Sequence, residues 1–487
     1  MADKIKYKIN NAEYEAKFTL STAPTSPDGG GDGGGGGGEG QGGAEINFSK
    51  SAIRGMDLEE NFLEPFTNGN IYINNPLDFI EDGKLVRGDG RDKFTILLEP
   101  VDGGSGAEEE KLPLEYNFVI SGELNSTGKT DRLNNFKTYR LLDRSYFLLS
   151  EQIPYGKRFR GKVGCIIKDI LEQFGIPCDP GEWENGDMEI DVLPEHILPP
   201  STFRYSDLIR YLIKLNYVKR GGTYVRIFLN WCRRCKYYKY KALSDIFMDN
   251  VKLTREGFMV DDLVTKCGVN KNNPNTGPGY TLTNVNNAAL ANTDFSTPML
   301  VYTNSYLNNL LVSNYDPILG EHIMNIIRIA DVKEYWTELF VQPFGYIGGK
   351  AQPWVVLNEV KTMKIFRNLG FPFPADRMRQ LAEAELTTNM TFFNLQLGFQ
   401  TLGNTDRQPG EFMDVSVARE DKEKEGVNPF SGDEIKHRSD AKLLGKWFIT
   451  KIRHEFTTAK VDNYTNLIQC IKPHIGPGEP TPSDSLL

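Results

Sequence analysis

The feature that most restricts the fold is the alternation of polar and apolar residues at both ends of the chain. It runs through "KIKYKINNAEYEAKFTL" near the N-terminus and through "GKWFITKIRHEFTT" near the C-terminus. A period of two places successive side chains on opposite faces, as in a strand that buries one face. Apolar residues alternate on the C-terminal strand, and one of its faces should be core: Trp447, Phe448, Ile449, Ile452 and Phe456. We therefore expect both ends of the chain to be β-structure.

The middle of the chain has a different period. "GKVGCIIKDILEQFGI" and "YSDLIRYLIKLNYV" carry apolar residues at helical spacing, and Ser206 is the expected N-cap of the second helix. A further helix is expected in "PADRMRQLAEAELTTNM", with Pro374 near its start. Strand patterns lie between these helices. The middle region is therefore predicted to be mixed α/β.

Residues 29–43 form a glycine-rich run, "GGGDGGGGGGEGQGG". Its composition favours a flexible surface loop, which we expect to be dispensable for folding. The run matches the pattern GxGxxG trivially, but it opens no helix and so predicts no phosphate site. The tail "GPGEPTPSDSLL" is expected to be peripheral or disordered.

Bulk composition limits the class of protein. A chain of 487 residues is too long for one core, so two to four domains are expected. The net charge of −9 argues against a dedicated nucleic-acid binder. Neither a signal peptide nor an apolar run long enough to span a membrane is evident. Six cysteines without regular spacing are typical of a reducing cytosol.

The segment "FLNWCRRCKYY" holds Cys232 and Cys235 in Cys-x-x-Cys spacing. This spacing occurs in thiol–disulfide redox sites, and the flanking basic residues would stabilise a thiolate. It also occurs in zinc sites, but these need four ligands, so Cys267 or a histidine would have to complete one. The following "KYYKYKAL" alternates like a strand, which favours a plain hairpin turn. The residues alone leave all three interpretations open.

His454 and Glu455 begin "HEFTT" like a zinc-protease helix, yet the second histidine of that motif is missing and the segment alternates as a strand. The other histidines are scattered along the chain: His196, His322, His437 and His474. Asp440 and Glu455 are interpreted as solvated charges. A catalytic carboxylate pair among the 65 Asp and Glu residues is neither indicated nor excluded by the residues themselves. With the resemblance described next, we predict that the chain is not an enzyme and that it has no catalytic, cofactor-binding or metal-binding residues.

Four stretches, in this order, resemble the baseplate central hub protein of contractile-tailed, T-even-like bacteriophages. They are "SAIRGMDLEENFLEPFTNGNIYINNP", "GKVGCIIKDILEQFGIP", "FRYSDLIRYLIKLNYV" with "FLNWCRRCKYYKYKALSDIF", and "QPGEFMDVSV" with "LLGKWFITKIRHEFTT" and "NYTNLIQCIKPH". The same module forms the N-terminal hub of type VI secretion spike proteins. The resemblance places Cys232 and Cys235 in a hairpin that leads into a second barrel, away from any chemistry.

The resemblance implies a mainly β fold with α/β parts, built from two tail-tube-like β-barrels, a mixed α/β domain and an inserted region. The expected divisions, in chain order, are a first barrel over 1–145, an α/β domain over 146–235, a second barrel over 236–264 and 385–475, an insertion over 265–384 and a tail over 476–487.

In function, the resemblance implies a structural hub of a phage tail baseplate. The expected assembly is a homotrimeric ring that adapts the six-fold tail tube to the three-fold spike and forms part of the DNA conduit. The implied partners are the tail tube or tube-initiator protein, the central spike, baseplate wedge proteins, and duplex DNA that passes without specific binding. The implied location is the virion tail baseplate, after assembly in the host cytoplasm. The alternatives are a hub of a phage-derived injection or secretion system, and a hub-linked cell-wall hydrolase.

Overall fold

The structure is a computed structural model. It describes residues 5–9, 12–21, 45–74, 92–101, 112–127, 136–184, 189–190, 199, 201–250, 257–259, 280–283, 309–316, 321–344, 363–367, 375–392, 395–416, 445–458 and 463–473. Several predictions fall outside these residues, namely the glycine-rich loop, the C-terminal tail, Cys267, Asp440, His196, His437 and His474.

The N-terminal part is β-structure, as the alternating pattern predicts. Its strands are β1 (Ile5–Ile9), β2 (Ala12–Ser21), β3 (Glu45–Asn47), β4 (Ile53–Asn61), β5 (Asn68–Asn74), β6 (Lys93–Val101), β7 (Leu114–Thr127) and β8 (Phe136–Asp143). Apolar residues on one face of these strands form a buried core that includes Phe18, Leu58, Phe94 and Phe118.

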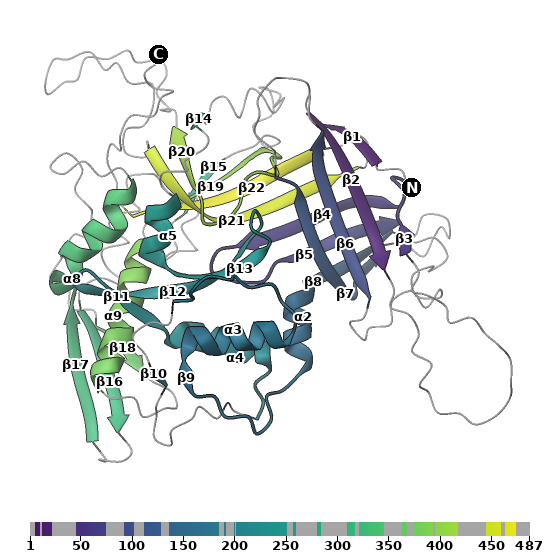
Figure 1. Cartoon of the computed structure of the whole chain (residues 1–487). Helices are drawn as coiled ribbons and strands as arrows, with labels where there is room; N and C mark the ends of the chain where they lie inside the picture. Colours follow the sequence, from purple (N-terminus) through teal and green to yellow (C-terminus); the bar gives the residue numbers. More distant parts are fainter. Residues whose placement is uncertain are drawn as a thin grey trace, which may run out of the picture.

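The middle part alternates helices and strands. In order, it contains α2 (Arg144–Glu151), β9 (Gly161–Lys162), α3 (Val163–Gln173), β10 (Glu189–Ile190), α4 (Tyr205–Leu215), β11 (Tyr217–Arg220), β12 (Thr223–Cys232), β13 (Tyr237–Ala242) and α5 (Leu243–Asn250). Helices α3 and α4 confirm the two predicted amphipathic helices, and their apolar faces enter one core with β12 and β13. This core lies beside the N-terminal strands in Figure 1.

The N-cap predicted for α4 is wrong. The helix begins at Tyr205, so Ser206 lies inside it and is buried, where it accepts a hydrogen bond from the Ser150 hydroxyl at 2.8 Å. The Asp207 carboxylate instead accepts from the Arg204 backbone N–H at 3.2 Å. An acidic residue in the first turn can satisfy an unpaired N-terminal donor from within the helix, which leaves the serine available for packing.

The C-terminal part returns to β-structure after a mixed segment. Its elements are β14 (Gly257–Met259), β15 (Tyr280–Thr283), β16 (Asn309–Asp316), β17 (Glu321–Arg328), α8 (Ile329–Trp336), η4 (Thr337–Val341), η5 (Gln342–Phe344), β18 (Met363–Arg367), α9 (Ala375–Phe392), β19 (Leu395–Leu402), β20 (Phe412–Ser416), β21 (Gly445–Thr457) and β22 (Asn463–Lys472). Helix α9 confirms the predicted helix that follows Pro374.

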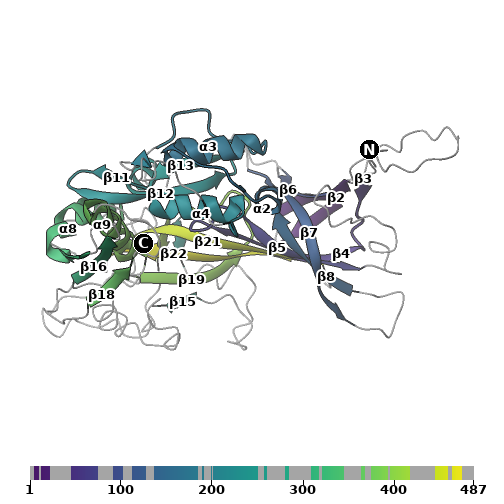
Figure 2. The same cartoon turned by 90° about the horizontal axis from the view of Figure 1, so that it is seen from below.

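The N-terminal strands form one sheet with β14, β15 and β19–β22 of the C-terminal part, whereas β16, β17 and β18 form a separate three-stranded sheet. The order of the large sheet is β1-β2-β6-β7-β8-β5-β4-β21-β22-β19-β15, with β3 paired to β2, and with β20 paired to both β21 and β14. The two sets meet where β4 pairs antiparallel with β21, from Lys451 opposite Asn61 to Thr457 opposite Gly55. Figures 1 and 2 both show β21 and β22 running between the helical part and the N-terminal strands.

The expectation of two separate closed barrels is therefore corrected, although the mainly β class with helical parts is confirmed. Among the described strands the sheet is open, because its path ends at β1 and at β15, and β4 joins the two sets by pairing with β5 on one edge and with β21 on the other. The segment 236–264, which the resemblance assigned to the second barrel, is also divided between two sheets. Tyr237–Ala242 pairs with β12 in a separate three-stranded sheet, whereas Gly257–Met259 joins the large sheet through β20.

Strand β21 changes partner along its length. Its first residues pair with β20, up to Phe448 opposite Phe412, and its later residues pair with β4 from Lys451 onward. Its register with β22 shifts between Ile449 and Lys451. Such a bulge bends a strand locally and lets it enter a second set of neighbours. Strand β21 therefore contributes to both cores, with Phe448 in one and Phe456 in the other.

Candidate functional site: a charged joint between the cores

The Cys-x-x-Cys segment forms the end of a hairpin. Strand β12 ends at Cys232 and β13 begins at Tyr237, with Cys232 opposite Tyr237. The Cys235 backbone N–H donates to the Cys232 carbonyl at 3.1 Å, and Lys236 has a φ of 59°. This is a tight turn closed by a left-handed residue. It confirms the prediction of a hairpin.

The turn directs Arg233 into the interior. Only 3% of its side chain is exposed, and its Nη2 donates to the carbonyl oxygens of Thr405 (2.6 Å) and Arg407. The neighbouring Arg234 donates to the Asp406 carbonyl at 3.0 Å and lies 3.4 Å from the Glu411 carboxylate. Two consecutive arginines thus attach the hairpin to the segment between β19 and β20.

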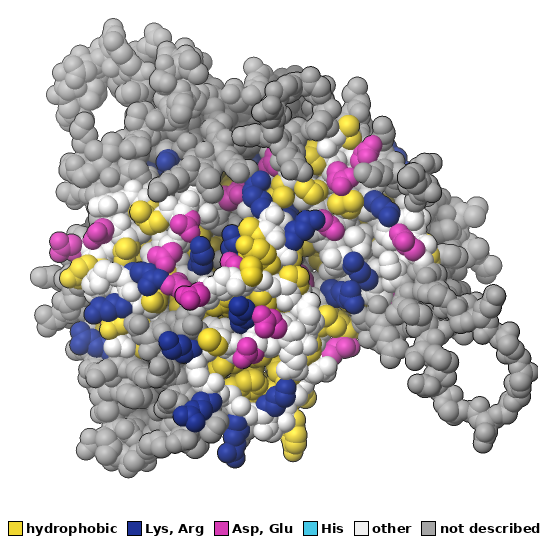
Figure 3. All heavy atoms as spheres, in the orientation of Figure 1, with side chains coloured by type: hydrophobic (Ala, Val, Ile, Leu, Met, Phe, Trp, Pro, Cys, Tyr) yellow, Lys and Arg dark blue, Asp and Glu magenta, His cyan; other side chains and the backbone are white. Residues whose placement is uncertain are grey.

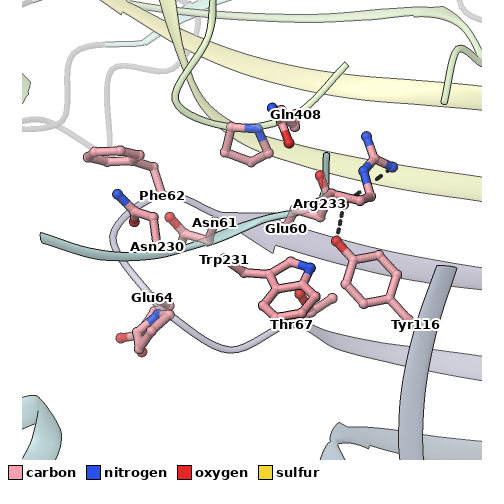
Figure 4. A pocket seen from close by; sticks show the side chains of 12 residues that line it. Glu60, Asn61, Phe62, Glu64, Thr67, Tyr116, Asn230, Trp231, Arg233 and Gln408 are labelled. Carbon is pink, nitrogen blue, oxygen red and sulfur yellow. Dashed lines mark hydrogen bonds and ion pairs between the residues drawn. The ribbon is translucent and has the colours of Figure 1, made fainter. Parts of the chain in front are cut away.

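Glu60 supplies the negative charge opposite Arg233. It lies on β4, is 5% exposed, and places its Oε1 3.6 Å from Arg233 Nη1. The Tyr116 hydroxyl of β7 donates to the same carboxylate, as Figure 4 shows. Burial alone would raise the pKa of Glu60, but Arg233, His454 and the hydrogen bonds together lower that pKa to about 2. Glu60 is therefore a carboxylate at neutral pH.

His454 lies on β21 on the other side of Glu60, with its Nε2 3.6 Å from Glu60 Oε2. Burial lowers the pKa of His454 despite the carboxylate, so the ring is neutral at pH 7. The Asn466 Oδ1 accepts from the Asn404 N–H (2.7 Å) and from Arg407 Nη1 (2.9 Å), which orients the amide.

The oriented amide assigns the tautomer of His454. The Asn466 NH₂ group lies 2.8 Å from His454 Nδ1 and can only donate, so Nδ1 accepts and the proton is on Nε2, facing Glu60. The ring faces the carboxylate across 3.6 Å without a hydrogen bond, and His454 is fully buried.

Five residues connect β4, β7, the β12–β13 turn, β21 and β22 at this place, and we call them the charged joint: Glu60, Tyr116, Arg233, His454 and Asn466. A cavity of about 30 Å³ borders it, lined in part by Glu60, Tyr116 and Arg233 together with Trp231 and Gln408 (Figure 4). This volume holds one or two water molecules, whereas pockets for small-molecule ligands occupy hundreds of Å³. The geometry is that of a structural contact.

A second contact, the aromatic joint, lies beside the charged joint. It is a cluster of phenylalanine rings from six elements or their ends: Phe62, Phe228, Phe247, Phe392, Phe412 and Phe448. The Phe448 ring centroid lies 5.0 Å from that of Phe62, 4.6 Å from that of Phe247 and 5.3 Å from that of Phe412. These distances are typical of favourable aromatic packing.

The structure brings together some of the residues that the sequence singled out. Cys232 and Cys235 flank the arginine of the charged joint, and His454 is part of it. Glu455 points to the opposite face of β21, where its carboxylate lies 3.2 Å from Arg453 Nε. His322 lies on β17. Among the described residues, no group of three or more His, Cys, Asp or Glu side chains is arranged to hold a metal ion.

Sequence reasoning missed Glu60, Tyr116, Arg233 and Asn466. A signal existed for Glu60, because it follows Met56 and Leu58 at a period of two and therefore shares their buried face. His454 carries the same signal between Ile452 and Phe456. No comparable local pattern marks Arg233, which lies in a turn.

On the face shown in Figure 3, basic and acidic side chains are interspersed over the described surface. A mixed surface of this kind lacks the single-sign stripe that attracts phosphates. Within the described ranges, no helix has the length and apolar character required to cross a bilayer.

No protein-family model matches the chain, and no curated protein matches it. Solved structures are similar to it at low sequence identity. The tail protein from Neisseria meningitidis MC58 is 8% identical over 93% of this chain and 96% of its own, with a TM-score of 0.43. The 43 kDa tail protein of prophage MuSo2 from Shewanella oneidensis is 10% identical over 94% and 98%, with a TM-score of 0.42.

A chain of the Francisella PdpA-VgrG complex in its lidded state is 9% identical. The alignment covers 96% of this chain and 54% of that one, with a TM-score of 0.47. These three similar structures are thus two tail proteins and a chain of a PdpA-VgrG complex.

Proposed function

We propose that the chain is the central hub of a contractile tail baseplate, with three copies forming a ring between the six-fold tail tube and the three-fold spike. The order of the four sequence stretches first suggested this role. The structural observation that carries it is the continuous sheet, in which the N-terminal and C-terminal strand sets are joined through β4 and β21.

A three-fold ring can present six-fold symmetry only if each subunit holds two comparable units in a fixed relation. The backbone ladder from β4 to β21 supplies such a fixed relation. The charged joint adds a second attachment, because it links β4 and β7 of the N-terminal set to β21 and β22 of the C-terminal set. In this proposal, the buried ionisable groups of the charged joint hold the two strand sets together.

The path of the sheet ends at β1 on one side and at β15 on the other. An edge strand offers backbone N–H and C=O groups to a neighbouring chain. We propose that neighbouring subunits close the ring through such edges. This arrangement joins copies head to tail, as a cyclic heterologous assembly requires.

In the proposed ring, the wall of the lumen belongs to a conduit for duplex DNA. The net charge of −9 and the mixed surface of Figure 3 favour passage without phosphate binding. The proposed partners are the tail tube or tube-initiator protein on one side, the spike on the other, and baseplate wedge proteins around the ring. The proposed location is the virion tail, after assembly in the host cytoplasm.

Native mass spectrometry of the purified full-length chain tests the assembly. Three subunits of 55.0 kDa give a particle of about 165 kDa (3 × 55.0). A strictly monomeric chain at micromolar concentration, which also fails to assemble when the spike protein is added, would contradict the proposal. Electron microscopy of the trimer should show a pore about 20 Å wide or wider, since duplex DNA must pass through it.

A further inference from the structure

Cys232 and Cys235 have a geometry that the proposed hub role does not use. The hydrogen bond from the Cys235 N–H to the Cys232 carbonyl makes residues 232–235 a β-turn, whose first and last Cα atoms lie within about 7 Å of each other. Disulfides join Cα atoms about 4.4–6.8 Å apart. The backbone of the turn therefore allows a bond between these two sulfur atoms without rearrangement of the strands.

The surroundings of the two thiols differ. Both are partly exposed, but Cys235 lies in the loop, where the Cys232, Tyr237 and Lys239 side chains lower the pKa of its thiol. The Lys239 ammonium lies 5.8 Å from the centroid of the Tyr237 ring, on the strand that leaves the turn. A thiol beside an ammonium group and open to solvent is the typical environment of a reactive cysteine.

We propose that Cys232 and Cys235 form a reversible disulfide when the protein meets a low-molecular-weight disulfide, such as oxidised glutathione. The Cys235 thiolate attacks one sulfur of the oxidant, which forms a mixed disulfide and releases one thiolate. Cys232 then loses its proton, attacks the Cys235 sulfur and expels the second thiolate. Two protein thiols are oxidised to one disulfide, and one oxidant molecule is reduced to two thiols.

The order of attack follows from the two environments. Burial raises the pKa of Cys235, but these neighbouring side chains outweigh it, so the pKa of this thiol is lowered. Burial and the neighbouring Cys235 thiol raise the pKa of Cys232 to about 11. The Cys232 thiol is therefore protonated at pH 8, which suits a group that reacts second, within the mixed disulfide.

A Cys232–Cys235 disulfide would restrict the two arginines that lie between the cysteines. The cross-link encloses Arg233 and Arg234, which hold the segment between β19 and β20 through the carbonyls of Thr405 and Asp406. Closing the turn covalently restricts both arginines to the conformation that makes these contacts. A protein assembled in a reducing cytosol would thus be reinforced after it reaches an oxidising environment.

The test treats the full-length protein with oxidised glutathione at pH 8 and maps its peptides by mass spectrometry without reduction. The expected product is a peptide spanning residues 232–235 that has lost two hydrogen atoms, together with an upward shift of the melting temperature. Cys232→Ser should stop the reaction at the glutathione adduct of Cys235. Cys235→Ser should slow modification of Cys232 at least tenfold.

The exposed Cys165 on α3 gives a matched control, because it lies outside the turn and Cys165→Ser should leave the cross-link unchanged. The wild-type peptide map decides the question even if a turn variant fails to fold. Complete modification of Cys165 while both turn cysteines stay reduced would overturn the proposal. Stoichiometric zinc on the purified protein that blocks alkylation of the pair would also overturn it.

Discussion

Glu60 and Phe62 lie two residues apart, yet they enter joints of opposite chemistry. Glu60 faces a guanidinium and an imidazole, whereas the Phe62 ring packs on other rings, with Phe228 at 5.2 Å and Phe448 at 5.0 Å between centroids. Both joints connect the same strand region to β21 and to the β12–β13 hairpin. The molecule thus contains a directional contact and a non-directional contact side by side.

The two contacts respond differently to change. Apolar packing loses stability in proportion to the volume removed, and it tolerates swaps of similar size. A buried ion pair adds little net stability when it is intact, but the loss of one partner leaves an uncompensated charge. We therefore expect the aromatic joint to supply most of the cohesion and the charged joint to select one arrangement of the two strand sets.

The largest effect is expected from a second carboxylate in the charged joint. Ile452 is fully buried and lies opposite Glu60 in the β4–β21 ladder. Ile452→Asp therefore places a second carboxylate opposite that of Glu60 on the adjacent strand. Burying an unpaired charge beside a like charge costs several kcal/mol, which is comparable with the whole stability of a domain. We expect no soluble folded protein, measured by circular dichroism and size-exclusion chromatography.

The neighbouring Arg453→Gln is the matched control. Arg453 is 40% exposed and forms an ion pair with Asp57 at 2.7 Å on the opposite face of β21. Asp57 is buried, but its carboxylate also accepts from the Asn70 N–H at 2.9 Å and from the Tyr72 hydroxyl at 3.4 Å. The loss of Arg453 therefore does not leave this carboxylate without a donor, and the variant should fold. If both variants fold equally well, Ile452 is not part of the core that the structure assigns.

The next effect is expected from Arg233→Met, which leaves Glu60 without its main counter-charge. The free energy of unfolding should fall by about 3–5 kcal/mol, as for other buried pairs from which one partner is removed. Adding Glu60→Gln should restore part of the loss, because the second substitution removes the buried charge. Urea denaturation of the single variants and the double variant measures this coupling. Additive losses would contradict a direct Glu60–Arg233 interaction.

Whether the sequence predicts a residue of such a joint depends on how far apart in the chain the contacting residues lie. The strands, α3, α4 and α9 follow from local periodicity, and even the buried Glu60 and His454 leave a trace in the period-two pattern. Arg233 leaves none, since its carbonyl partners lie more than 170 residues away in the chain. The same holds for the pairing of β4 with β21. Local patterns predicted two strand sets, but they did not predict that the sets share a sheet.

Glu60 and Asp143 should make the free energy of unfolding depend on pH in opposite directions. The pKa of Glu60 is lowered to about 2, so its contribution is present above the unfolded value of 4.5 and is lost as pH falls toward 2. Burial outweighs the hydrogen bonds from Ser145 and Tyr146 and raises the pKa of Asp143 to about 6. The carboxylate of Asp143 is enclosed even though the residue as a whole is partly exposed.

A raised carboxyl pKa means that the folded state binds the proton more tightly, so stability falls as pH rises from about 4 to about 6. We expect Asp143 to account for about 1–3 kcal/mol of this change. Denaturation midpoints at half-unit pH steps should show a weaker decline above pH 4 in Asp143→Asn and a weaker loss below pH 4.5 in Glu60→Gln. Parallel curves for wild type and Asp143→Asn would contradict the assignment.

A small effect is expected from Phe448→Leu in the aromatic joint. The substitution keeps an apolar side chain of somewhat smaller volume in contact with Phe62, Phe247 and Phe412. Such swaps cost about 1 kcal/mol. The same denaturation assay should therefore rank this variant well above Arg233→Met. A loss equal to that of Arg233→Met would mean that the aromatic joint is as directional as the charged one.

The last expected effect is a stabilisation, not a loss, and it concerns a segment outside the residues that define the two joints. Residues 22–44 contain the glycine-rich run and connect β2 to β3, and the two ends of this connection, Ser21 and Glu45, are paired opposite each other in the sheet. A short hairpin turn can join paired residues directly, so a four-residue replacement requires no strain in either strand. Loop-closure entropy changes by only about 0.6 kcal/mol per doubling of length, which gives roughly 1.5 kcal/mol of added stability for this shortening. The melting temperature should stay unchanged or rise slightly, and the effects of Arg233→Met and Phe448→Leu should be the same in the shortened background. A collapse of folded yield on shortening would show that these residues make contacts on which the sheet depends.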